Sequence, residues 1–397
     1  MSDILAVDRA RIAEEECKVP IELEAVIAAV QAEIHEHKAI IAASQRRLDD
    51  YKYPVLTLPN EIVSEIFIHF LPVYPLRPPL YGPLSPDFLT RICHKWRRIA
   101  LGTPALWRAL SLHIAGNTSD AAFELHIGIA KEWLSRSGCC PISIDMQDDD
   151  HSVRRTTQLL DVIALHQARW EYVKLVMATS DLHIVGGSKP LLCCLSLNTY
   201  DRNQGAVSPS RPIEAPLLRT VTIGSYSLHT ADLLPLSQLT SLRLDGITLE
   251  ESWPVLALTF SLVHCELVLW GADADVPSDL SLPHLESLIL WDGQWVWGVN
   301  GAMERSLEPW VLPALRMLQV SGSCLGTDPD ATLASFVTKS GCKLEEVRIM
   351  GKRLYTQKHY RDLFPSISKF SFNSRLDGES DRDTDPNIDS GSEDGSL

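Results

Sequence analysis

The hexapeptide LTSLRL at residues 239–244 carries the pattern that decides the fold: an apolar residue, two others, then two apolar residues separated by one. The pattern occurs nine times, with starts spaced 22, 26, 21, 23, 23, 30, 29 and 23 residues apart. Its alternation predicts a short strand, and a unit of this length cannot bury its own apolar face, so the units are predicted to stack as a solenoid. The alternative is an ordinary α/β domain with evenly spaced strands. The nine copies are Trp170-Val173-Leu175, Leu192-Leu195-Leu197, Leu218-Val221-Ile223, Leu239-Leu242-Leu244, Leu262-Cys265-Leu267, Leu285-Leu288-Leu290, Leu315-Leu318-Val320, Leu344-Val347-Ile349 and Ile367-Phe370-Phe372.

Two further strands are predicted before the first copy. Leu110 with Leu112, and Ile142 with Ile144, show strand alternation, and a helix is expected between them from about residue 119 to 137. Strands that alternate with helical segments are typical of an α/β fold, which is the fold class expected here.

A set of short helices is expected between residues 54 and 110. Pro59 suits a first helical turn, Glu61 favours the positive end of the helix dipole, and Pro72 ends the segment. This helix carries an apolar stripe of Ile62, Val63, Ile66, Phe67 and Phe70.

A second helix is expected to begin at the capping residue Ser85 and to end at Gly102, with Leu89, Ile92, Cys93, Trp96 and Ala100 facing inward. A very short third helix is expected after Thr103-Pro104, with Trp107 locking it into the core. Three helices in about fifty residues form a small core, so part of their apolar surface is expected to serve a partner.

These short sequences, in this order, resemble an F-box of the kind found in large families of fungal proteins. The resemblance departs from the minimal pattern in a proline-rich insert from Val73 to Pro83. It implies docking on a Skp-family adaptor of a cullin-RING (SCF) ubiquitin ligase. The positions that carry the resemblance are Leu58, Pro59, Glu61, Ile62, Ile66, Phe67, Leu71, Pro72, Ile92, Cys93, Trp96, Arg97, Ala100, Thr103, Pro104, Leu106 and Trp107. The adaptor-binding candidates among them are Leu58, Pro59, Glu61, Ile62, Ile66, Phe67, Ile92, Cys93 and Trp96.

The repeated hexapeptides resemble leucine-rich repeats, which implies a curved parallel sheet with one strand per unit. Where such repeats usually place an asparagine, this chain has Tyr200, Ile247, Gly293, Ser323 and Lys352. Without that side chain the units are expected to be irregular, with a mixture of helices and loops on the convex side.

A protein substrate is expected on the concave surface, which the side chains between the apolar positions are predicted to face. These candidates are Arg219, Thr222, Arg243, Glu286, Ile289, Arg316, Gln319, Glu345 and Arg348. Six of the ten tryptophans lie between residues 253 and 310, and Trp291, Trp295 and Trp297 form a candidate recognition patch, because tryptophan is favoured at binding hot spots. The alternative is that these rings fill gaps between irregular repeats.

Residues 1–53 are predicted to form an amphipathic helix. Leu23, Ile27, Val30, Ile34, His37, Ile41, Ser44, Leu48 and Tyr51 follow one another at intervals of four and three, which is a heptad seam. The helix is expected either to form a homodimer through a short coiled coil or to pack back on its own F-box.

Composition excludes several classes of function. The net charge is −15, and the chain shows no clustered basic face, so a nucleic-acid partner is not expected. The acidic N-terminus does not resemble a signal peptide, and the most apolar run is interrupted by His264 and Glu266, so we expect no membrane partner and a cytoplasmic or nuclear location. The nine cysteines contain no CxxC and are expected to be reduced thiols. Residues 373–397 are expected to form a disordered acidic tail.

The sequence contains none of the GxSxG, GxxxxGK[ST] or HExxH motifs, and no cofactor or metal site is expected. We therefore expect four regions: the helix 1–53, the F-box 54–110, a substrate-binding repeat domain 111–372 and the tail. The resemblance implies a non-catalytic substrate-recognition adaptor of an SCF ligase. The alternatives are an F-box/repeat scaffold without ligase activity and, more remotely, an enzyme with a site assembled from non-contiguous residues of the repeat domain.

Overall fold

The computed structural model of the 397-residue chain describes residues 2–50, 54–148, 152–200, 211–270, 279–293, 305–351 and 355–373. The chain divides into two compact units, Met1–Val63 and Ser64–Leu397. None of the described helices is long and apolar enough to cross a membrane.

The first unit is dominated by one long helix. Helix α1 spans Ser2–Asp50, and a 3₁₀ helix, η1, follows at Pro54–Thr57. The sequence of α1 is rich in alanine and glutamate, which favour helix. The predicted N-terminal helix is confirmed, although Tyr51 at the end of the heptad seam lies outside the described residues.

Helix α2 spans Asn60–Phe70, close to the predicted segment. The amide of Val63 donates to the Pro59 carbonyl at 3.1 Å, so Pro59 sits at the helix start as expected. The apolar stripe divides into two faces. Val63 and Phe67 are buried, whereas Ile62 and Ile66 are 50% and 46% exposed.

The predicted second helix is wrong as a continuous element, because it is two helices with a break between them. Helix α3 spans Pro86–Leu89 and helix α4 spans His94–Leu101. Ser85 caps α3 as predicted. Thr90 ends it, since both its amide and its hydroxyl donate to the Asp87 carbonyl, at 3.0 and 2.7 Å.

The break changes the role of two predicted inward-facing residues. Cys93 is the N-cap of α4, where its Sγ accepts from the Trp96 amide at 3.5 Å. Ile92 lies between the helices and is 48% exposed. Gly102 ends α4 as expected, and the 3₁₀ helix η2 (Pro104–Trp107) follows with Trp107 fully buried.

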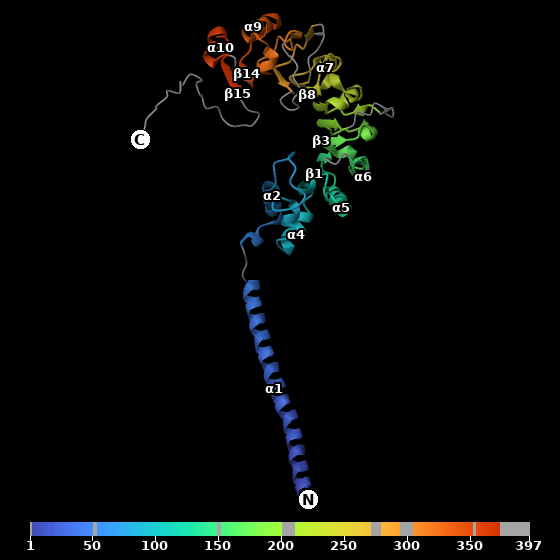
Figure 1. Ribbon diagram of the computed structural model, residues 1–397, viewed down its shortest axis with the longest axis vertical. Coiled ribbons are helices and arrows are strands. Elements are labelled where there is room, and N and C mark those ends of the chain that lie inside the picture. Colours follow the sequence, from blue (N-terminus) through green and yellow to red (C-terminus); the bar gives the residue numbers. More distant parts are fainter. Residues whose placement is uncertain are drawn as a thin grey trace, which may run out of the picture. The chain divides into compact units, whose positions relative to one another are not determined.

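The rest of the second unit is built on an eleven-stranded parallel sheet whose strand order is the chain order. Figure 1 shows these strands following one another along a curved path. All eleven predicted strands are present, and the α/β class is confirmed. The strands are β1 (Ala109–Ile114), β2 (Ile142–Asp148), β3 (Trp170–Met177), β5 (Cys194–Thr199), β7 (Thr220–Gly224), β8 (Ser241–Ile247), β9 (His264–Leu269), β11 (Ser287–Asp292), β13 (Met317–Ser321), β14 (Glu346–Met350) and β15 (Lys369–Asn373).

The core lies on one face of this sheet, because the two closely spaced apolar residues of each repeat stand in two adjacent rows. In β7, for example, Val221 pairs with Leu242 and Ile223 with Leu244, and all four are buried. Parallel strands in one register place equivalent leucines side by side, so each unit buries its apolar residues against its neighbours.

The connections between strands are irregular, because they differ in length and in the elements that they contain. Gly293 directly follows β11, and its amide donates to the Leu269 carbonyl at 2.8 Å. A Cβ at this position would lie only 2.8 Å from the same oxygen, so glycine is required. The connecting elements are the helices α5 (Asp120–Arg136), α6 (Val153–Ala164), α7 (Leu249–Leu256), α9 (Pro329–Ser340) and α10 (Gln357–Leu363), the 3₁₀ helices η3 (Gln167–Arg169), η4 (Thr179–Ile184), η5 (Ser225–Leu233), η6 (Leu236–Gln238) and η7 (Gly322–Leu325), and the short strand pairs β4 (Gly187–Ser188) with β6 (Ile213–Glu214) and β10 (Leu280–Ser281) with β12 (Trp310–Val311).

Candidate functional site: the polar face of the sheet

The face of the sheet opposite the core, which we call the polar face, carries the side chains between the buried rows. Because side chains alternate along a strand, the residue between the two apolar positions of each repeat faces this side. The strand register joins these residues into one continuous row across eleven strands. The row is Ser111, Asp145, Lys174, Ser196, Thr222, Arg243, Glu266, Ile289, Gln319, Arg348 and Ser371.

Four side chains in the middle of the polar face form a hydrogen-bonded group, which we call the Arg243 cluster. Arg243 donates through Nε to Asp245 Oδ1 at 2.9 Å and through Nη1 to Glu266 Oε1 at 2.5 Å. Trp291 Nε1 donates to the same Glu266 oxygen at 2.9 Å. The indole is therefore held by a carboxylate that also accepts from Arg243, so the ring has a fixed orientation on the polar face.

An apolar area adjoins the Arg243 cluster. Val268 pairs directly with Trp291 in the register of β9 and β11, and Ile289 lies two residues before Trp291 on the same face. All three are partly exposed. Together with the indole they offer a contact surface of the kind that forms the centre of protein interfaces, with charged side chains at its edge.

A second charged group lies on the last strands of the same face. Arg348 Nε donates to Glu346 Oε1 at 2.6 Å, and Lys369 Nζ lies 3.0 Å from the same oxygen. The hydrogen bond from Arg348 and the nearby Lys369 charge hold the pKa of Glu346 below its ordinary value, despite partial burial. This carboxylate therefore stays charged and keeps both cations in place.

The placement of four substrate-binding candidates on this face is wrong. Arg219, Glu286, Arg316 and Glu345 each precede the first residue of a strand and lie at the edge where strands begin. Arg219 donates to the Pro216 carbonyl at 3.0 Å, and Arg316 lies 3.2 Å from Glu345 in an exposed ion pair. Side chains alternate with a period of two, so only some intervening positions share a face. Thr222, Arg243, Ile289, Gln319 and Arg348 are placed as predicted.

The tryptophans between residues 253 and 310 do not share one role. Trp291 lies on the polar face, and Trp295 and Trp297 lie outside the described residues. Trp310 is fully buried, packs edge to face on Trp253 at 5.7 Å, and donates from Nε1 to the Ser306 carbonyl at 2.9 Å. Trp310 is therefore a core residue, and the recognition patch of Trp291, Trp295 and Trp297 stays a prediction.

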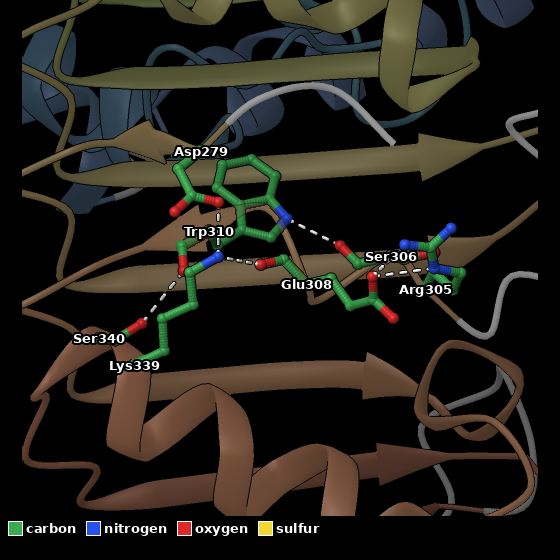
Figure 2. Close-up of polar contacts among 7 residues, drawn as sticks. All are labelled: Asp279, Arg305, Ser306, Glu308, Trp310, Lys339 and Ser340. Atoms are coloured by element: carbon green, nitrogen blue, oxygen red, sulfur yellow. Dashed lines mark hydrogen bonds and ion pairs between the residues drawn. The ribbon is translucent and has the colours of Figure 1, made fainter. Parts of the chain in front are cut away.

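The surroundings of Trp310 form a structural clamp (Figure 2). Lys339, at the end of α9, donates from Nζ to Asp279 Oδ1 at 2.6 Å and to the Glu308 carbonyl at 2.5 Å. Figure 2 also shows Ser340 Oγ donating to the Trp310 carbonyl, at 3.4 Å. These bonds join the end of α9 to the chain near the start of β10 and to β12 with the residues just before it.

The proline-rich insert forms a strap that joins the helical region to the sheet, which the sequence did not predict. Tyr74 donates to Glu171 Oε2 at 2.6 Å, and Arg77 donates from Nη2 to the Ile144 carbonyl at 3.0 Å. Ser143 Oγ donates to the Pro75 carbonyl at 2.8 Å. Burial and the bond to Glu171 raise the pKa of Tyr74, so its hydroxyl remains a donor. The strap fixes α3 and α4 to the first strands of the sheet.

The adaptor-binding candidates divide into exposed and packed residues. Ile62, Ile66 and Ile92 are about half exposed, and Pro59 and Glu61 are also exposed. Leu58 is partly exposed.

Phe67 is corrected to a core residue, because it is 1% exposed and its ring packs edge to face on Trp96 at 4.9 Å. Cys93 and Trp96 are only partly exposed, and the two residues form the cap of α4. The exposed aliphatic candidates are therefore Ile62 and Ile66 on α2 and Ile92 just before α4.

The described residues contain no group of three or more histidine, cysteine or acidic side chains arranged to hold a metal ion. Burial raises the pKa of the thiols of Cys265, Cys324 and Cys342. These thiols are poor nucleophiles, since it is the thiolate that reacts. A comparison of the chain with protein-family models and with curated proteins finds no match in either.

Proposed function

We propose that the chain is a substrate-recognition adaptor of an SCF ubiquitin ligase. The residues that resemble an F-box dock on a Skp-family adaptor, which is bound in turn by a cullin, and the polar face holds a target protein. The protein contributes to ubiquitin transfer by proximity, because tethering converts a bimolecular encounter into a local one.

The observation that carries this proposal is the division of α2 into two apolar faces. Val63 and Phe67 serve the core, whereas Ile62 and Ile66 stand one helical turn apart on the surface. Two aliphatic side chains about half exposed on one short helix are expected at an interface, where they complete their burial. The resemblance to the F-box names the partner.

Replacing Ile62 and Ile66 together by alanine is expected to weaken binding to the Skp-family adaptor about 30-fold. Burying the exposed half of each side chain is worth about 1 kcal/mol, so the pair contributes about 2 kcal/mol. The measurement is isothermal titration calorimetry of the full chain with purified adaptor.

The matched control for this experiment is the double variant Leu125→Ala with Leu165→Ala, because both leucines are exposed on other elements. Its affinity for the adaptor should equal that of the wild type. If the wild-type chain does not bind the adaptor, or if both double variants bind as it does, the docking proposal is wrong. Recruitment of cullin and transfer of ubiquitin in a reconstituted assay then separate a ligase subunit from a scaffold that only binds.

Trp291→Ala is expected to release the target protein while leaving the adaptor bound. An aromatic residue held in position at the centre of an interface contributes about 2 kcal/mol or more. The measurement is quantitative mass spectrometry of proteins captured from a fungal lysate by the wild type and by the variant.

Phe260→Ala is the matched control, because Phe260 is exposed but lies outside the sheet. Proteins retained by Phe260→Ala and lost by Trp291→Ala are the candidate targets. If Trp291→Ala captures the same set of proteins as the wild type, the polar face around Trp291 is not the target-binding surface.

A further inference from the structure

Helix α1 exposes an apolar seam that runs from Leu23 to Ile34 and resumes at Ile41 after the polar His37. Leu23, Ile27, Val30, Ile34 and Ile41 are each between 46% and 66% exposed, and they follow one another at intervals of four, three, four and seven residues. These intervals keep the side chains on one line of a helix that is slightly underwound to 3.5 residues per turn. A seam of this length is not stable against water by itself, so it requires a partner helix.

The residue types along the seam select the number and direction of the helices. Numbered as a heptad, Ile27, Ile34 and Ile41 occupy the a positions, and Leu23 and Val30 occupy d positions. β-Branched residues at a with leucine at d favour two parallel strands, a pattern that Leu23 follows and the β-branched Val30 does not. The next d positions are polar, His37 and Ser44, and polar core residues fix the register, since they are satisfied only when they face one another.

The flanking charges point to an identical helix as the partner. Glu33 occupies a g position and Lys38 the e position five residues later. In a parallel dimer without stagger, a g residue of one helix lies beside the e residue of the following heptad on the other helix. Glu33 of each copy therefore lies beside Lys38 of the other copy, which gives two ion pairs between the chains. An antiparallel pair brings g against g instead and loses both of these ion pairs.

We propose that α1 pairs with α1 of a second copy of this chain as a parallel, in-register, two-stranded coiled coil. Leu23 to Ser44 forms its core, and the Glu33–Lys38 pairs set its direction. The resulting protein carries two F-box regions and two polar faces. The proposal does not depend on the adaptor function, because any activity of the second unit would be doubled in the same way.

The first test is the molar mass of the full chain by size-exclusion chromatography with light scattering. Twice the chain mass of 44.2 kDa is expected. Ile34→Glu is expected to raise the dissociation constant by at least about 100-fold, because two charges enter an apolar core. Ala32→Glu is the matched control: it adds the same charge at an outward f position and should remain dimeric. A monomeric wild type, or a trimer, overturns the proposal.

The second test asks for the direction of pairing. Glu33→Lys and Lys38→Glu are each expected to weaken the dimer about 5- to 30-fold, because each replaces two attractive pairs by two repulsive ones. The combined variant restores opposite charges across the interface and should recover most of the affinity. Glu33 also lies 3.8 Å from His37 on its own helix, so Glu33→Lys removes this contact within the helix as well. The contact is equally absent from the combined variant. Recovery therefore measures the pair between chains, and an affinity that falls further overturns the parallel arrangement.

The third test is disulfide cross-linking in a Cys17→Ser background, which removes the native thiol of the helix. Ser44→Cys places thiols at facing d positions, and it should form a covalent dimer on mild oxidation. Arg46→Cys, at an outward f position, should not. Equal cross-linking of the two variants overturns the in-register arrangement.

Discussion

Trp107→Ala is expected to destabilise the protein by about 3 to 5 kcal/mol, the range for removing a large aromatic side chain from a core. Trp107 is fully buried and donates from Nε1 to the Ala100 carbonyl at 2.9 Å. Its ring packs edge to face on Trp133 of α5 at 5.4 Å, and the Arg136 guanidinium lies 4.5 Å from the ring centre. The loss would remove a large part of the 5 to 15 kcal/mol by which native proteins are stable.

Chemical denaturation followed by circular dichroism measures this effect. Trp107→Phe is the informative second variant: it keeps an aromatic ring but removes the indole donor to the Ala100 carbonyl, which retains only the longer bond from the Thr103 amide at 3.3 Å, so about 1 to 2 kcal/mol should be lost. Trp291→Ala is the matched tryptophan control, because its ring lies on the polar face and its removal opens no cavity in the core. A Trp107→Ala variant as stable as Trp291→Ala would show that Trp107 does not join α4 to α5.

The free energy of unfolding of the wild type is expected to rise by about 2 to 3 kcal/mol relative to that of Lys189→Met between pH 7 and pH 10. Lys189 is fully buried beside the ring of Trp170, with Nζ donating to the Gly186 carbonyl at 2.7 Å. Burial lowers the pKa of this amine from 10.5 to about 8. The protonated form is therefore disfavoured in the folded protein by about 1.4 kcal/mol for each unit of the shift.

The sign follows from proton binding. Between pH 8 and pH 10.5 the unfolded chain keeps the proton on Lys189 and the folded chain has released it, so the free energy of unfolding rises with pH in this interval. Below pH 8 the full cost of the buried charge is present. The wild type should therefore gain stability relative to Lys189→Met as the pH rises from 8 to 10.

Urea denaturation of both proteins at a series of pH values gives this difference. Titration of the buried thiols of Cys265 and Cys324 affects both proteins equally and cancels in the difference. Lys358→Met, at an exposed lysine of α10, is the matched control. A free-energy difference between wild type and Lys189→Met that is constant with pH would contradict the prediction.

The strands could be predicted from sequence because the apolar pattern within each repeat is enough to indicate a strand. Three apolar residues at fixed spacing indicate a strand and its buried face. The pattern occurs nine times, which indicates that neighbouring repeats pack side by side. The helix predicted from residue 119 to 137 was equally clear, since Ser119 caps α5 and Ser137 ends it. Local capping and periodicity need no knowledge of distant residues.

The errors came where two local signals compete or where the partner is distant in sequence. Thr90 closes α3 through its bonds to Asp87, although the apolar spacing continues through Ile92. The Arg243 cluster was only partly predicted: Arg243 and Trp291 were candidates, but Glu266, which joins them, was not. Its role depends on the register between β8, β9 and β11, which no hexapeptide encodes.

The strap and Lys189 were missed for a related reason. Tyr74 bonds to a residue 97 positions away, and proline-rich sequence by itself indicates only a rigid loop. A lysine is rarely buried, so sequence reasoning places it in solvent unless a partner is visible. Nothing in the sequence indicates that the Gly186 carbonyl and the Trp170 ring contact Lys189.

The identity of strand order and chain order has a consequence for synthesis. In the eleven-stranded sheet, each strand after β1 is hydrogen-bonded to the strand that precedes it in the chain order of that sheet, and that strand has already left the ribosome. Within this sheet, no strand except the newest waits for a partner that has not yet been made, so the sheet can grow one strand at a time from its N-terminal end. The exposed edge of the nascent sheet is then always a single strand, and each new repeat covers the edge left by the last.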